Sequence, residues 1–310
     1  MSIGHYIKEI GRGKDGARPL SQAQAADLMG QVLDGQVSDL ELGAFCIAMR
    51  IKGETPEEMA GFLDATEQRL TKVQICPTPP GHAAVVIPSY NGARKLPVLT
   101  PLLALLLARQ GLPVLIHGTA TENARVYTAA VLAELEVPVL QAADALAPGQ
   151  VAFCPTALLL PGLQRLLEVR RVLQLRNPAH SLVKLMQVCS GPQVLVTSYT
   201  HPEYAVAMEQ VLCLRRSSAL LSRGTEGEAV ADPRRMPRMG RILHGVASPA
   251  LEHQGGPLGQ LPELPACDAP STAVYIRAVL EGALPVPAPI AMQVAQVVEL
   301  ARHAAAPGAP

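Results

Sequence analysis

The 310 residues are 49% hydrophobic and 17% charged, with a formal net charge of zero. This composition excludes a disordered chain and suits a globular protein of about two domains. The longest apolar run, Leu96–Ala108, is shorter than the roughly 20 residues that a membrane-spanning helix needs. Met1–Gly16 is polar and glycine-rich, unlike a secretory signal. We therefore expect a cytoplasmic protein without a membrane partner.

The amino-terminal part is predicted to contain three amphipathic helices, because apolar residues recur there at the helical period. Each helix is preceded by a hydroxyl residue that can accept a hydrogen bond from the free backbone N–H groups of the first turn. Two of the three starts are capping boxes, in which an acid three residues later returns the bond. The expected caps are Ser21, Ser38 with Glu41, and Thr55 with Glu58.

These helices are predicted to form a small helical (dimerisation) domain over residues 1–76, joined by part of 165–188. Such a domain buries little area alone, so we expect it to pack on the next domain or on a partner chain. The Pro-rich segment Pro77–Gly81 then links it to an α/β domain over residues 82–310.

The α/β domain is predicted to begin with a right-handed βαβ unit of a parallel sheet. The short apolar runs Val85–Ile87 and Val114–Ile116 are typical of buried strands, and Leu96–Ala108 between them is typical of a core helix. Ligands of such sheets bind beyond the carboxyl ends of the strands. The loops at 88–95 and 117–123 are therefore the expected binding region.

Further elements are expected in the rest of the chain. Thr200-His201-Pro202-Glu203 is interpreted as another capping box, and residues 232–241 form a turn-rich basic segment. Strands are predicted at Val137–Leu140, Val194–Thr197 and Ala219–Ser222, and helices over much of 166–187 and at Tyr204–Leu212, Ser271–Glu281 and Ile290–His303.

The charges are segregated although they sum to zero. Between Pro161 and Gly245 twelve Lys and Arg stand against six Asp and Glu, a bias that favours an anionic partner. Arginine suits phosphate oxygens because its guanidinium can bind two of them at once. Solvated protein surface is the alternative for every one of these cations.

The candidate nucleic-acid contacts are the cations nearest the expected binding loops and in the basic stretch. The later arginines lack aromatic neighbours, so they favour phosphate contact over base stacking. Tyr90 is the one aromatic residue nominated to stack on a base. The cations are Arg94, Lys95, Arg170, Arg171, Arg176, Arg234, Arg235, Arg238 and Arg241.

Four short sequence motifs occur in the order typical of one enzyme family: Ile51–Glu58, His117-Gly118, Phe153-Cys154-Pro155 and His201–Tyr204. Because of these motifs, essentially the whole chain resembles the anthranilate phosphoribosyltransferase-like (TrpD-like) family. The resemblance implies the nucleoside phosphorylase/phosphoribosyltransferase fold, which also carries glycosyltransferases. This fold has a small N-terminal helical domain and a larger α/β domain with a mainly parallel central sheet. The resemblance also implies a homodimer joined through the helical domain.

Two segments, 88–95 and 223–228, resemble more particularly a branch of TrpD-like proteins described as nucleic-acid-binding rather than biosynthetic. The enzymes of the family have a glycine-rich loop whose backbone N–H groups hold the pyrophosphate of phosphoribosyl pyrophosphate. Here Pro88 lacks an N–H and Tyr90 occupies space beside it. The degenerate phosphate-site positions are Ser89, Asn91, Gly92, Thr100, His117, Gly118 and Thr119.

Two further departures concern charge. The family's lysine before His117 is replaced by Ile116, which removes a phosphate contact. The family's adjacent acids that hold Mg²⁺ correspond only to Glu226 and Glu228, separated by Gly227 and expected to be solvated. A structural role is also favoured for His117, fixing a turn beside Gly118.

The sequence therefore predicts a homodimer that binds nucleic acid, either single- or double-stranded DNA or RNA, through a basic groove and largely independently of base sequence. No residue is assigned a catalytic role, and neither a cofactor nor a metal is expected. One alternative is a phosphoribosyltransferase that acts on a phosphoribosyl or nucleoside substrate with Mg²⁺. Another is a protein-interaction scaffold whose arginines meet an acidic partner.

Overall fold

A computed structural model describes residues 2–13, 15–76, 81–122, 124–251 and 258–306. Most of the predicted linker Pro77–Gly81 lies outside these described residues. The chain divides into two compact units. The helical unit consists of Met1–Thr71 and Thr156–Met186, and the α/β unit consists of Lys72–Pro155 and Gln187–Pro310. The second segment of the helical unit thus begins at Thr156, whereas the sequence analysis predicted a segment within 165–188.

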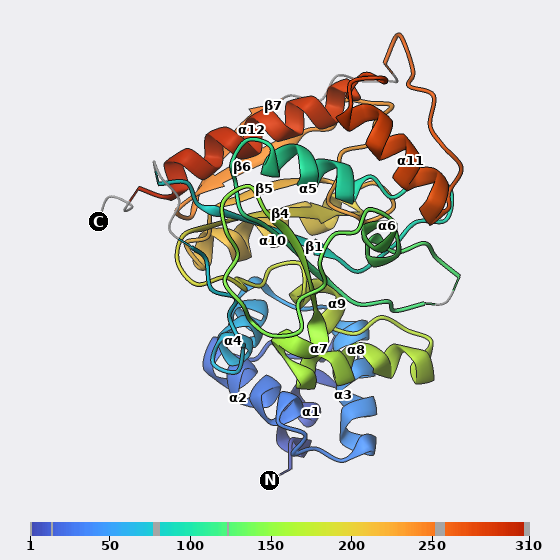
Figure 1. The fold of residues 1–310 in the computed structure, drawn as a ribbon. Helices are drawn as coiled ribbons and strands as arrows, with labels where there is room; N and C mark the ends of the chain where they lie inside the picture. The colour runs from blue at the N-terminus through green and yellow to red at the C-terminus, as the bar shows by residue number, and fades with distance from the viewer. Residues whose placement is uncertain (1, 14, 77–80, 123, 252–257, 307–310) are drawn as a thin grey trace. The chain divides into compact units, whose positions relative to one another are not determined.

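The helical unit carries the three predicted helices with their caps (Figure 1). Ser21, Ser38 and Thr55 each accept a hydrogen bond from a backbone N–H, and the side chain three residues on returns it. The capping prediction is confirmed at all three starts. The helices are α1 (Gly4–Ile10), which the sequence did not predict, α2 (Gln22–Leu33), α3 (Asp39–Lys52), α4 (Pro56–Glu67), α7 (Thr156–Leu159), α8 (Pro161–Leu173) and α9 (Ala179–Leu182).

The α/β unit is built on a seven-stranded sheet of order β3-β2-β1-β4-β5-β6-β7. The first five strands in this order are parallel. β6 pairs antiparallel with β5, and β7 pairs antiparallel with β6. The fold class predicted from the sequence, a helical part with a larger α/β part and a mainly parallel sheet, is confirmed. The strands are β1 (Ala84–Ser89), β2 (Val114–Gly118), β3 (Val151–Pro155), β4 (Gln193–Tyr199), β5 (Ala219–Arg223), β6 (Met239–Leu243) and β7 (Val246–Leu251).

Helices cover both faces of this sheet. On one face, the core joins the strands to the helices α5 (Thr100–Ala108), α11 (Ala269–Leu280) and α12 (Ala288–Ala304) (Figure 1). On the other face, α10 (Pro202–Leu214) packs on β4 and β5. Every residue of β1 and β2 is buried, which explains why their sequences are apolar runs without alternation. The remaining helix, α6 (Thr128–Glu134), packs beside α11.

Two predicted elements are wrong in detail. Val137–Leu140 is not a strand: Pro138 cannot donate to a ladder, and only Val139 forms a bridge, to Phe153 in β3. The capping box at Thr200–Glu203 is absent because Pro202 is in the first turn and makes His201 the N-cap. Thr200 therefore lies one residue too early to cap the helix.

None of the helices in the described part of the chain is long and apolar enough to cross a membrane.

Candidate functional site

The strand order reverses at β1, because β2 and β3 follow on one side and β4 and β5 on the other. In open α/β sheets, ligands bind at the carboxyl ends of the strands beside such a reversal. The loops after β1, β2 and β5 reach this edge in the α/β unit. The candidate site is built from them.

The loop after β5 forms a tight turn, Thr225–Glu228. The backbone of Thr225 and Glu228 is joined by hydrogen bonds of 3.1 and 2.9 Å, and the two residues between them have φ of +51° and +94°. Positive φ at both central positions is the geometry of a type I′ turn, which favours glycine at the second. A Cβ at Gly227 would lie 2.5 Å from Asn91 Nδ2, so the turn fits closely against the loop after β1.

Two side chains from neighbouring parts of the α/β unit hold this turn in place. Asn91 Nδ2 donates a 2.6 Å hydrogen bond to the carbonyl oxygen of Gly227, and Ser198 Oγ donates one of 3.1 Å to the same oxygen. The turn is therefore fixed from β4 and from the loop after β1.

The carboxylate of Glu228 enters the loop after β1 and is only 2% exposed. Its Oε1 accepts hydrogen bonds of 2.8 Å from the backbone N–H groups of both Asn91 and Gly92. Its Oε2 accepts a 2.5 Å bond from Ser89 Oγ and a 3.3 Å bond from Thr100 Oγ1. We call these four donors, on Ser89, Asn91, Gly92 and Thr100, the oxyanion nest.

Gly92 allows the nest to form. Its φ is +62°, which turns consecutive N–H groups toward one point, and an added Cβ would lie 2.8 Å from the carbonyl oxygen of Val126. Asn91-Gly92 is thus both a turn and part of a binding loop.

Glu226, on the same turn, bonds to the next part of the loop. Its Oε2 accepts hydrogen bonds from the backbone N–H groups of Arg94, at 2.7 Å, and Lys95, at 3.2 Å. Burial raises the pKa of Glu226, but these bonds and one from Leu96 outweigh it and leave the pKa lowered. Glu226 is therefore held as an anion. The expectation of solvation is wrong for Glu228, which is buried and accepts hydrogen bonds from protein donors in place of water. Glu226 remains partly exposed.

The site does not fit the Mg²⁺ that the enzymes of the family imply. A magnesium ion needs free oxygen lone pairs, whereas the Glu228 oxygens face N–H and O–H donors, whose positive ends repel a cation. Within the described residues, no group of three His, Cys, Asp or Glu side chains could hold a metal.

Tyr90 and His117 form a buried pair beside the nest. A 2.8 Å hydrogen bond joins Tyr90 Oη to His117 Nδ1, and the rings meet edge to face. Tyr90 is 3% exposed and His117 is fully buried. The nomination of Tyr90 as a stacking residue is therefore wrong, because its ring packs inside the α/β unit. Gly118 is also structural: a Cβ there would lie 2.0 Å from the carbonyl oxygen of Ser89.

Burial of His117 should make the protein less stable in mild acid. Burial lowers the pKa of His117 from 6.5 to about 3. Between these pH values the imidazole is protonated in the unfolded chain and neutral in the folded protein. The free energy of unfolding then falls as the pH falls from about 6.5 toward 3. Between pH 7 and 5 the loss is on the order of 2 kcal/mol.

Urea unfolding of wild type and His117→Asn at pH 7 and pH 5 checks this expectation. The variant should lose less stability between the two pH values, whereas an equal loss in both proteins would contradict it. His180 in the helical unit is also buried with its pKa lowered to about 3, so His180→Asn serves as the matched comparison.

The cations predicted in the α/β unit do not share one surface. Arg94 and Lys95 are exposed. Arg234 forms a two-point ion pair with Asp232, at 2.9 Å through each nitrogen, and Arg235 lies 3.7 Å from the same carboxylate. The hydrogen bonds and charge of Asp232, and to a smaller degree the charge of Glu226, raise the pKa of Arg234.

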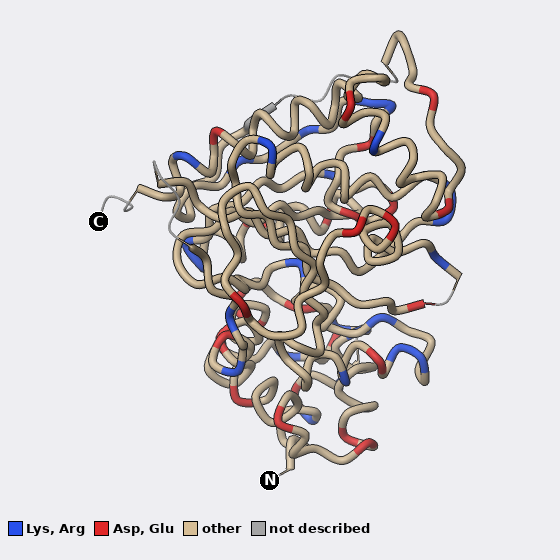
Figure 2. The backbone as a smooth tube through the Cα atoms, in the orientation of Figure 1, with Lys and Arg blue, Asp and Glu red and all other residues tan. Residues whose placement is uncertain are grey.

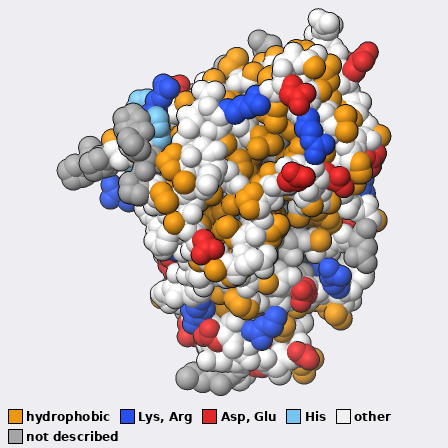
Figure 3. All heavy atoms as spheres, viewed as in Figure 1, with side chains coloured by type: hydrophobic (Ala, Val, Ile, Leu, Met, Phe, Trp, Pro, Cys, Tyr) orange, Lys and Arg blue, Asp and Glu red, His pale blue; other side chains and the backbone are white. Residues whose placement is uncertain are grey.

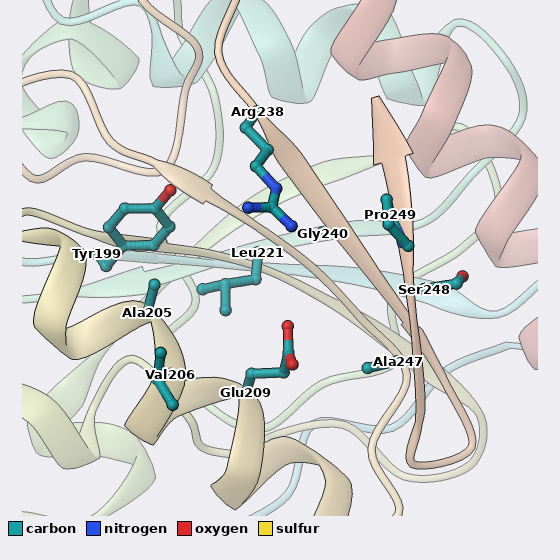
Figure 4. Close-up of a pocket in the computed structure, with 10 residues that line it drawn as sticks. All are labelled: Tyr199, Ala205, Val206, Glu209, Leu221, Arg238, Gly240, Ala247, Ser248 and Pro249. Atoms are coloured by element: carbon teal, nitrogen blue, oxygen red, sulfur yellow. The ribbon is translucent and has the colours of Figure 1, made fainter. Parts of the chain in front are cut away.

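Arg238 and Arg241 face elsewhere. Arg241 is on β6 rather than in a turn and pairs with Glu299 at 2.7 Å. Arg238 borders a hollow of about 270 Å³ between α10 and β5–β7, where its guanidinium and the Glu209 carboxylate point toward each other (Figure 4). The hollow is lined by Tyr199, Ala205, Val206, Glu209, Leu221, Arg238, Gly240, Ala247, Ser248 and Pro249.

In the helical unit, three cations gather near His180. After burial, the positive charges of Arg176 and Arg170, and to a smaller degree Lys184, lower its pKa. Arg171 is exposed on α8. Lys184 was not among the predicted nucleic-acid contacts.

Comparisons with known proteins agree with this architecture. The helical bundle domain of the glycosyl transferase family matches residues 5–69. The uncharacterized protein YbiB of Escherichia coli (strain K12) is 39% identical over 303 residues, which cover 95% of this chain and 93% of YbiB. The chain belongs to the TrpD-like family.

Anthranilate phosphoribosyltransferases are also similar to this chain, at lower identity. Anthranilate phosphoribosyltransferase of Salinispora arenicola (strain CNS-205) is 26% identical over 85% of this chain and 76% of its own length. Two solved structures show the same fold. That of the Thermus thermophilus enzyme has a TM-score of 0.69 at 22% identity over 96% of this chain and 88% of the enzyme. The Saccharomyces cerevisiae enzyme, in complex with PRPP and Mg, has a TM-score of 0.67 at 15% identity over 98% and 94%.

Charges of this TrpD-like protein are spread along both units (Figure 2). On the face of the α/β unit seen in Figure 3, the described Lys and Arg side chains lie dispersed among Asp and Glu. The described side chains therefore form no continuous basic band on that face.

Proposed function

We propose that this TrpD-like protein binds nucleic acid as a homodimer in the cytoplasm, without catalysis and largely independently of base sequence. The observation that carries the proposal is the cationic rim around the closed nest. The rim consists of Arg94 and Lys95, which are exposed, and Arg125, which lies 3.4 Å from the carbonyl oxygen of Gly92 and pairs with Glu122.

Arg94 and Lys95 are the strongest candidates for phosphate contact. Their backbone N–H groups are bound by Glu226, which fixes the loop, while both side chains are exposed. A fixed loop that presents exposed cations loses little entropy when it binds an anion. Phosphate contacts of this kind carry no base information, hence the expected tolerance of sequence.

The phosphoribosyltransferase alternative rests on the family alone. Against it, the donors that could hold a pyrophosphate already bind Glu228, and both oxygens of the Glu228 carboxylate face these donors rather than a cation. A nucleic acid needs neither the nest donors nor a Mg²⁺ site, because it can bind the rim while Glu228 stays in the nest.

The homodimer has support within the helical unit. Three large apolar side chains there are mostly exposed: Leu40, at 84%, Val172, at 82%, and Ile51, at 58%. A second chain packed over them would remove these apolar side chains from water. Sedimentation should give twice the mass of one chain.

Fluorescence anisotropy with two labelled single-stranded oligonucleotides of unrelated base sequence tests the proposal. At low salt both should bind with micromolar or tighter dissociation constants that agree within about threefold, which is less than 1 kcal/mol. Failure of both to bind would refute nucleic-acid binding, and binding of one alone would refute sequence tolerance.

A further inference from the structure

We propose that Glu228 is an internal ligand that plugs an oxyanion site, and that the nest without it binds inorganic phosphate. The site consists of the four donors on Ser89, Asn91, Gly92 and Thr100. The plug is the turn Thr225–Glu228, which carries the carboxylate into them.

The donors are arranged for an anion with two oxygens on one side. Two consecutive backbone N–H groups converge on one oxygen, and two hydroxyls approach the other. A carboxylate satisfies this arrangement, and so does a phosphate presenting two of its oxygens. All four groups present hydrogens to the same point, so the nest favours an anion, whether it is a side-chain carboxylate or a free ion.

The nest stands on rigid elements rather than on the plug. Ser89 ends the buried strand β1 and also bonds to Thr128 Oγ1 at 2.7 Å, while Thr100 begins α5. Ala93, the residue after Gly92, exchanges two backbone hydrogen bonds with Val126, at 2.8 and 3.0 Å. Removal of the Glu228 carboxylate should therefore leave the donors in position and without an acceptor.

An empty nest is unfavourable because its donors are buried. Unpaired buried donors lose their hydrogen bonds to water without replacement. A free phosphate ion would restore those bonds, so the binding should appear as phosphate-dependent stability. In wild type the tethered carboxylate has a high effective concentration and should exclude the free ion.

Thermal unfolding and isothermal titration calorimetry with inorganic phosphate test the plug in Glu228→Ala. The variant should melt below wild type in phosphate-free buffer. It should regain at least about 3 °C in about 50 mM phosphate relative to chloride of equal ionic strength. Wild type and the exposed-acid control Glu281→Ala should show a smaller shift, no larger than phosphate causes in folded proteins generally.

Two further variants make the result decisive. Ser89→Ala in the Glu228→Ala background should weaken phosphate binding, which locates the ion in the nest. Glu228→Gln keeps the side-chain shape and one acceptor oxygen, so it should fold and still bind phosphate more tightly than wild type. The proposal is overturned if folded Glu228→Gln and Glu228→Ala bind phosphate no better than wild type. It is also overturned if wild type binds phosphate as tightly as they do.

Discussion

Substitution of both Arg94 and Lys95 by glutamate should lower the affinity for single-stranded DNA about ten- to hundredfold at low salt, equivalent to about 1.4–2.8 kcal/mol. The change removes two exposed cations from the rim of the nest and adds two anions that repel phosphate. The backbone N–H groups that bind Glu226 are unaffected, so the fold should persist. Anisotropy titrations of wild type and variant measure the change.

A matched double variant separates the rim from net charge. Arg216 and Arg302 are also exposed, but Arg216 precedes β5 at the opposite edge of the sheet and Arg302 is in the last turn of α12. Arg216→Glu/Arg302→Glu changes the net charge equally and should weaken binding far less. Equal losses in the two double variants would show that binding follows overall charge and not the rim.

Replacement of Glu58 by alanine should destabilise the helical unit by about 3–5 kcal/mol. Its fully buried carboxylate forms an ion pair with Lys52 at 2.5 Å and accepts the N–H groups of Leu20, at 2.8 Å, and Thr55, at 2.9 Å. Alanine would leave a nearly buried ammonium without its carboxylate and two backbone donors without an acceptor. Urea unfolding followed by circular dichroism measures the loss.

The neighbouring acid is the control for that substitution. Glu57 is in the same first turn of α4 but is exposed, so Glu57→Ala should change stability by no more than about 0.5 kcal/mol. Glu58→Gln keeps an acceptor for the backbone donors and should fall between the two. If Glu58→Ala is as stable as Glu57→Ala, then the buried ion pair contributes nothing net.

Local patterns predicted much of the fold. Ser21, Ser38 and Thr55 identified helix starts because capping is decided within four residues. Val85–Ile87 and Val114–Ile116 identified parallel strands because buried strands are short and wholly apolar. The helix α1 escaped prediction because its start, after Ile3, has no side-chain cap. Val137–Leu140 misled because its apolar run contains a proline.

The sequence analysis located the loop of the candidate site but did not identify the side chain that binds there. Ser89, Asn91, Gly92 and Thr100 were named as positions of a degenerate phosphate loop, and they do converge. What fills them comes from Glu228, more than 100 residues away in the sequence, and no local pattern connects the two. The Glu226-Gly227 pair could have indicated a type I′ turn, which would have directed Glu228 back toward the sheet.

The cations illustrate a second limit. Sequence gives the number of arginines between 161 and 245 but not their partners. Arg234 and Arg241 proved to be paired with Asp232 and Glu299, whereas Arg94 and Lys95 remain exposed. A charge count overestimates a basic surface wherever acids distant in the sequence fold against it.

The salt dependence of single-stranded DNA binding by the wild-type protein tests the central claim most directly. The account predicts that the logarithm of the association constant falls linearly with the logarithm of the salt concentration. Its slope should be about 0.7 per phosphate contact, and so at least about 1.4 if Arg94 and Lys95 both bind. Affinity that does not change with salt, or no binding at the lowest salt concentration, would contradict it.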